Sequence, residues 1–105
     1  MGSTPEAKIK KLVSKLLDQY EPLYRFWPVP SGFGASSLDC IVCYKGNFIA
    51  IETKAPGKKP TPRQQLYIDA MRAAYGAVFV VDSENALYNL ELHLTWLRDK
   101  NADHS

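Results

Sequence analysis

The sequence lacks the features that mark membrane, secreted and zinc-binding proteins. Its longest uninterrupted apolar run, Ala77 to Val81, is too short to cross a bilayer, and its N-terminus has no apolar stretch like that of a signal peptide. Cys40 and Cys43 lie three residues apart on an expected strand, where their side chains leave opposite faces and cannot form a disulfide with each other. No second pair of cysteines or histidines stands at zinc-ligand spacing, so we interpret both cysteines as small core residues. We therefore expect a cytoplasmic protein with no membrane contact.

The net charge of the chain is small. Thirteen Lys and Arg residues against eleven Asp and Glu residues give a net charge of +2, which does not by itself indicate a nucleic-acid partner. A chain of 105 residues has room for one domain with one small core, and this length excludes a separate cofactor-binding module. The composition, 46% hydrophobic and 23% charged, is that of a folded globular domain. We expect its core within residues 5–98 and flexible ends at residues 1–4 and 99–105.

Three segments have the apolar spacing of amphipathic helices. Residues 5–20 and residues 84–98 each repeat apolar side chains at intervals of three and four. Residues 62–75 do so more weakly, but they follow Thr61 as an N-cap and carry Gln64 at the spacing of a capping box. We expect three helices, one at each end of the chain and one between.

Four shorter segments have the composition of strands: residues 23–27, 38–44, 47–54 and 77–81. The second and third are joined by Lys45-Gly46, a two-residue connection typical of a β-hairpin. An antiparallel hairpin followed by a helix and a further strand predicts a mixed sheet flanked by helices. The expected fold is α/β, with elements in the order αβββαβα.

The predicted hairpin brings charged residues together. A turn at Lys45-Gly46 sets Asp39 directly opposite Glu52, and Lys54 shares the face of Glu52 because side chains alternate along a strand. Two carboxylates in direct opposition destabilise a sheet, so such a pair implies a bound cation or a shared proton. Carboxylates suit Mg²⁺. The alternative is an edge cluster in which the lysine offsets the two acids in solvent.

Two further polar residues are expected at the same place. Glu6 extends the apolar face of the first helix at its entrance, and Gln64 lies on the inward face of its own helix with Ile68. Each has a simpler explanation, since Glu6 interacts favourably with the helix dipole and Gln64 caps its helix. Both alternatives remain open from the sequence.

The spacing of these residues resembles a known family. Asp39, a gap of twelve residues and then Glu52-Thr53-Lys54, preceded by Glu6 on a helix, resembles the PD-(D/E)XK nuclease superfamily, and within it the small single-domain VRR-NUC nucleases of phages and bacteria. The stretches GASSLDCIV, IAIETKA and T-P-x-Q, and the strand that follows Gly76, are similar to landmarks of that group in the same order. The sequence departs from the group at Leu38, where proline is common. The resemblance implies a restriction-endonuclease-like sheet flanked by helices.

The resemblance also implies an activity and its residues. It implies a metal-dependent endonuclease that hydrolyses DNA phosphodiesters with Mg²⁺, with Mn²⁺ able to substitute and no organic cofactor. The implied catalytic residues are Asp39, Glu52, Lys54 as the catalytic lysine, Glu6, and Gln64 in support. The implied metal ligands are Asp39, Glu52, the backbone carbonyl of Thr53, and Glu6 for the metal or its water.

Partners follow from the same resemblance and from the basic residues. Small nucleases of this kind often act as homodimers on branched DNA, so the resemblance implies a structure-selective enzyme for a four-way (Holliday) junction, flap or fork. It also implies a protein that is encoded by a phage and active in the host cytoplasm. We expect six basic residues to contact DNA phosphates, although a solvated surface has the same composition: Lys8, Lys11, Lys15, Lys58, Lys59 and Arg63. We interpret Tyr24, Phe26 and Trp27 as core or dimer interface, with base stacking as the alternative.

Two other functions are compatible with the sequence. One is a catalytically silent module that binds DNA or a protein partner on the same fold, since a fold does not guarantee activity. The other is a small structural protein in which the hairpin acids are incidental.

Overall fold

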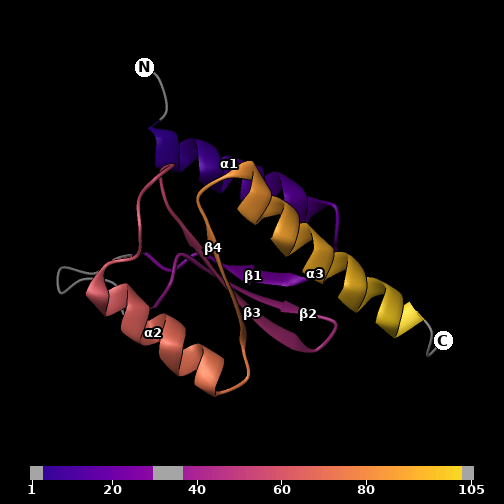
Figure 1. Cartoon of the computed structure of the whole chain (residues 1–105). Coiled ribbons are helices and arrows are strands. Elements are labelled where there is room, and N and C mark those ends of the chain that lie inside the picture. The colour runs from indigo at the N-terminus through magenta and orange to yellow at the C-terminus, as the bar shows by residue number, and fades with distance from the viewer. Residues whose placement is uncertain (1–3, 30–36, 103–105) are drawn as a thin grey trace.

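The computed structural model describes residues 4–29 and 37–102. It contains, in chain order, α1 (Pro5–Asp18), β1 (Tyr24–Phe26), β2 (Cys40–Tyr44), β3 (Asn47–Thr53), α2 (Pro62–Ala73), β4 (Ala77–Val81) and α3 (Glu84–Ala102) (Figure 1). This order confirms the predicted αβββαβα fold.

The four strands form one mixed sheet in the order β1-β2-β3-β4. The first two pairings are antiparallel, and β4 lies parallel to β3. Lys45 and Gly46 both have positive φ, at 52° and 78°, as a type I′ hairpin turn requires. This turn sets Tyr44 opposite Asn47 and Cys40 opposite Ile51, so the predicted register is confirmed.

The helices cover the two faces of this sheet (Figure 1). Helices α1 and α3 pack against one face, where Ile49 and Ile51 of β3 are fully buried. Helix α2 covers part of the other face, where Ala50 packs against Ile68. Because side chains alternate along β3, Glu52 follows Ala50 onto the α2 face. None of the helices in the described part of the chain is long and apolar enough to span a bilayer.

Several expected boundaries and one burial assignment were wrong. The first helix ends at Asp18, and α3 continues to Ala102, so residues 99–102 are helical rather than flexible, with the Asn101 amide donating to the Leu97 carbonyl at 2.7 Å. Residues 1–3 and 103–105 lie outside the described part. Cys40 is fully buried as expected, but Cys43 is exposed because it lies on the α2 face, near the hairpin turn and away from the α2 core cluster.

The end of α2 also differs from expectation. The helix stops at Ala73, and Tyr75 rather than a glycine takes the left-handed conformation, with φ of 66° and 99% of its surface exposed. Gly76 is required by packing, since a Cβ there would lie 2.8 Å from a ring carbon of Phe48. The turn therefore places strain on a tyrosine that makes no buried contact.

Replacing Tyr75 with glycine is expected to stabilise the protein by about 0.5–1 kcal/mol, because glycine adopts the left-handed conformation without the Cβ penalty. The measurement is the free energy of unfolding in urea. Ala74→Gly is the matched control: Ala74 has φ of −89°, so glycine there should destabilise by about the same amount. Changes of the same sign in the free energy of unfolding for the two variants would contradict the explanation.

Candidate active site

The end of the β2–β3 hairpin brings Asp39 and Glu52 into contact. The strand ladder stops at Cys40 and Ile51, and beyond it the backbone N–H of Asp39 donates to Oε1 of Glu52 at 3.2 Å. The carboxylate of Glu52 therefore accepts a hydrogen bond at the position where the backbones of the two strands would otherwise pair.

Thr53, the residue after Glu52, holds the carboxylate of Asp39 in place. Oδ2 of Asp39 accepts hydrogen bonds from the backbone N–H of Thr53 at 2.9 Å and from the Thr53 hydroxyl at 2.6 Å. Thr53 is fully buried. Its side chain is thus a positioning group that the sequence analysis missed, since only its backbone carbonyl was expected to take part.

Glu52 is the one buried charged residue of the described chain. Only 2% of it is exposed, Oε2 accepts from Nε2 of Gln64 at 2.8 Å, and Nζ of Lys54 lies 3.5 Å from the same oxygen. Burial, and next the negative charge of Asp39, raise the pKa of Glu52 to about 7, against the opposing effect of Lys54. At neutral pH its carboxyl group is therefore poised between the protonated and the ionised form.

Gln64 performs both of the roles that the sequence left as alternatives. Its Oε1 accepts from the backbone N–H of Thr61 at 2.9 Å, which completes the capping box of α2, while its Nε2 donates to Glu52. One amide group therefore fixes both the start of the helix and the orientation of the buried carboxylate.

Glu6 pairs with a lysine of its own helix rather than with these residues. Its carboxylate is 3.8 Å from Nζ of Lys10 and its side chain is 43% exposed, so it does not point inward as the helical pattern predicted. Pairing with a lysine one turn later in solvent avoids the cost of burying the charge. Within residues 4–29 and 37–102, no three His, Cys, Asp or Glu side chains form a group able to hold a metal ion. Asp39 and Glu52 thus stand as a pair.

This pair fits a divalent cation in its chemistry. Two adjacent carboxylates, one buried and with its pKa raised by the charge of the other, form a site where a cation removes the repulsion. Carboxylate oxygens are the ligands that Mg²⁺ prefers, and it usually keeps one or two of them together with water and phosphate oxygens.

The six basic residues expected to contact DNA are all exposed and fall into two groups. Lys8, Lys11 and Lys15 lie on α1, while the others lie in the β3–α2 connection and the first turn of α2: Lys58, Lys59 and Arg63. The guanidinium Nε of Arg63 donates to the Tyr67 hydroxyl at 3.4 Å.

Comparison with known proteins identifies the fold. No family model and no curated protein matches the sequence. Among solved structures, one described as a VRR_NUC domain is similar, with a TM-score of 0.70 and 21% sequence identity over 85% of this chain and 97% of that chain. The chain has the VRR_NUC fold. The similarity covers nearly the whole of the other domain and most of this chain.

We expect the stability of the metal-free protein to depend on pH through Glu52. Its folded pKa of about 7 lies above the ordinary value of 4.5, so ionisation favours the unfolded chain, and stability falls as pH rises from about 4.5 to about 7. The loss is at most about 3 kcal/mol, at 1.36 kcal/mol per pKa unit. Glu52→Gln should lack this dependence.

The measurement is the free energy of unfolding at pH 5 and pH 8, with a chelator present, for wild type and Glu52→Gln. Glu84→Gln, which removes an exposed carboxylate at the start of α3, is the control. Parallel pH profiles for wild type and Glu52→Gln would show that the buried carboxyl group does not titrate as described.

Proposed function

We propose that this chain is a divalent-metal-dependent endonuclease that hydrolyses phosphodiester bonds of DNA. The observation that carries the proposal is the buried Glu52, in contact with Asp39 and Lys54, at the end of the central hairpin of a VRR_NUC fold. A structural role alone gives no reason to bury a carboxylate beside another acid, because this costs stability that an apolar side chain would retain.

The carboxylates of Asp39 and Glu52 are the groups that would hold Mg²⁺, or Mn²⁺ in its place. The backbone carbonyl of Thr53 is proposed as a third ligand, and Glu6 as an outer contact reached by rotation of its exposed side chain. When bound, the ion lowers the pKa of a coordinated water and stabilises charge on the phosphate under attack.

The lysine has a separate role. The side chain of Lys54 is 12% exposed, so its ammonium group is largely removed from bulk water. A fixed cation in such a place stabilises negative charge more strongly than one in water, and the bond to Glu52 sets its position. We assign to Lys54 the orientation of the attacking water and the neutralisation of charge that develops on the phosphate.

The proposed substrate follows from the exposed basic residues. Basic side chains on α1 and around the start of α2 suit contacts to the phosphate backbone, and they carry no base-specific pattern. We therefore propose recognition of DNA by shape, with branched structures such as a four-way junction, flap or fork as substrates. Cutting two strands of a junction calls for two active sites, which a homodimer with two-fold symmetry supplies.

The first test is cleavage of matched linear, flap, fork and four-way-junction DNA with Mg²⁺, Mn²⁺ or a chelator. We expect metal-dependent cutting that falls at least about a hundredfold in Glu52→Gln and Lys54→Met, as for the loss of a group that stabilises the transition state. Lys100→Met, at an exposed position on α3, is the matched control for the lysine. Folded protein that binds DNA but cuts none of these substrates with either metal would contradict the proposal and favour the silent binding module.

A second test separates the two roles of Gln64. Gln64→Glu keeps an acceptor for the Thr61 N–H but replaces the donor to Glu52 with a negative charge, whereas Thr61→Ala removes part of the cap alone. We expect Thr61→Ala to cost about 1 kcal/mol of stability with little change in kcat. Gln64→Glu should lower the stability, because it removes the donor to buried Glu52 and places a further negative charge beside it, and it should move the acidic limb of the pH–rate profile to higher pH, because this charge raises the pKa of Glu52. Unchanged profiles in both variants would limit Gln64 to capping.

A further inference from the structure

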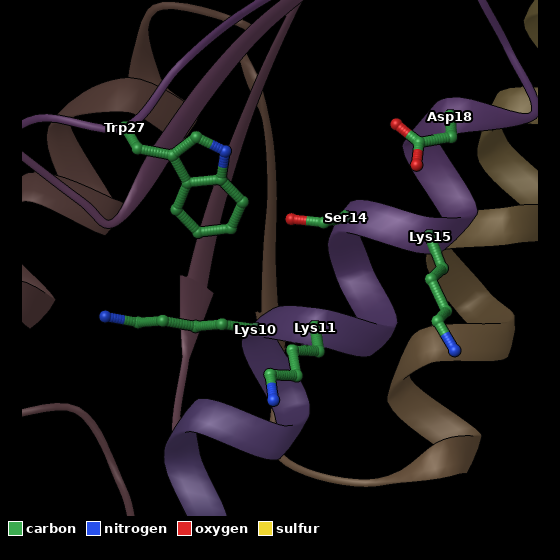
Figure 2. Close-up of a pocket in the computed structure, with 6 residues that line it drawn as sticks. All are labelled: Lys10, Lys11, Ser14, Lys15, Asp18 and Trp27. Atoms are coloured by element: carbon green, nitrogen blue, oxygen red, sulfur yellow. The ribbon is translucent and has the colours of Figure 1, made fainter. Parts of the chain in front are cut away.

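A second site lies on the other side of the sheet from the carboxylates. A pocket of about 490 Å³ opens between α1 and the segment that follows β1 (Figure 2). Its lining consists of Lys10, Lys11, Ser14, Lys15, Asp18 and Trp27. This volume falls within the range of roughly 300–1,000 Å³ that is usual for small-ligand sites.

The pocket favours an anion. Three of its six lining residues are lysines, and its one carboxylate is already paired, because Oδ1 of Asp18 accepts from Nη2 of Arg25 at 2.8 Å. Nη1 of the same guanidinium donates to the backbone carbonyl of Ser14 at 3.2 Å. Nη2 of Arg25 also pairs with Glu21 at 2.6 Å, and Lys10 pairs with Glu6 at 3.8 Å, so the charged groups at the pocket keep a small excess of positive charge.

The pocket also offers an aromatic surface. Trp27 is partly buried and packs against the core between the sheet and helices α1 and α3, which restrains its ring. Figure 2 shows the indole ring on one side of the pocket and α1 on the other. The side chains of Ser14 and Lys10 extend from α1 on the side of the ring, whereas those of Lys11 and Lys15 point away from it. An aromatic platform, a hydroxyl group and an ammonium group together match the base, the base edge and a phosphate of a nucleotide.

The pocket lies at the same end of the sheet as the candidate active site. The β1–β2 register pairs Phe26 with Ile41, and one further step along it sets Trp27 beside Cys40, the residue after Asp39. Lys10, on the opposite wall, is paired with Glu6. A strand that passes from the carboxylates around the short edge strand β1 would therefore lead toward the pocket.

We propose that this pocket binds an unpaired nucleotide of the DNA strand next to the cleaved bond, with the base against Trp27 and a flanking phosphate on Lys10. The inference rests on the proposed function, and it names the substrate feature that the site would select. In a duplex both faces of each base are covered by its neighbours, so only an unpaired base can stack on the indole. Stacking on one aromatic ring tolerates any base, which fits selection by structure rather than by sequence.

The test uses Trp27 as its own reporter. The sequence holds two tryptophans, so Trp96→Phe leaves Trp27 as the only indole. This protein is titrated, without divalent metal, with a single-stranded oligonucleotide, the matched duplex and the corresponding mononucleotide. We expect quenching of the Trp27 fluorescence by the single strand, with affinity at least about tenfold above that for the duplex and the mononucleotide. Equal affinity for the duplex, or for the mononucleotide, would overturn the proposal that an unpaired strand occupies the pocket.

Variants assign the binding to these side chains, with affinity measured by anisotropy of a labelled oligonucleotide. Trp27→Leu and Lys10→Gln should each weaken single-strand binding by about tenfold or more, Trp27→Phe should restore part of the loss, and Lys45→Gln in the hairpin turn should have little effect. Thermal unfolding verifies that Trp27→Leu is folded, and Lys10→Gln tests the pocket independently if it is not. Unaltered affinity in folded Trp27→Leu, or in Lys10→Gln, would overturn the assignment.

The outcome is separable from that of the nuclease test. Quenching without cleavage would support the pocket and contradict the endonuclease. Metal-dependent cleavage without quenching would support the endonuclease and overturn the pocket.

Discussion

The contact between Asp39 and Glu52 is the interaction on which the rest of this site depends. Glu52 is 2% exposed and lies beside another acid, an arrangement that costs stability unless other groups compensate for it. Compensation comes from three donors on three segments: the backbone N–H of Asp39, the amide of Gln64 and the ammonium group of Lys54. Removing one of these donors leaves an acceptor oxygen of the buried carboxylate without its partner. The geometry of the Asp39–Glu52 pair and the packing of α2 are therefore energetically linked.

The hairpin turn determines this contact from the opposite end of strands β2 and β3. Two consecutive residues with positive φ, Lys45 and Gly46, match the twist of the strands and permit one register, and a slip of one residue would send Glu52 to the α1 face. The buried alternation of Ile49, Ala50 and Ile51 enforces the same register from both sides of the sheet. A local turn and a global packing pattern thus agree on where the carboxylate stands, and such agreement across levels is what specifies a unique structure.

The sequence was informative where periodicity or turn chemistry determines structure, and uninformative where tertiary contacts do. The turn and the strand alternation predicted Asp39 opposite Glu52, and the capping-box spacing placed Gln64. Helical periodicity did not locate the carboxylate of Glu6, because a flexible side chain at a helix start can turn back to a lysine one turn later. The hydroxyl bond from Thr53 to Asp39 depends on how the chain bends after the ladder ends, and no local pattern encodes that bend.

The pocket beside Trp27 shows the same limit and explains why a basic helix is not by itself a binding site. On the sequence, the lysines of α1 are equivalent solvated charges, and Trp27 is one aromatic in a short strand. The fold gives them different surroundings, because Arg25 pairs with both Asp18 and Glu21 while the core holds the indole across from α1. Cationic side chains become selective only when a rigid apolar surface stands at a fixed distance from them, since the charges then attract any phosphate but the surface accepts only an exposed base. In this chain both elements occur at the end of the sheet where the two carboxylates meet, so the proposed cleavage and the proposed strand binding would act on the same substrate strand.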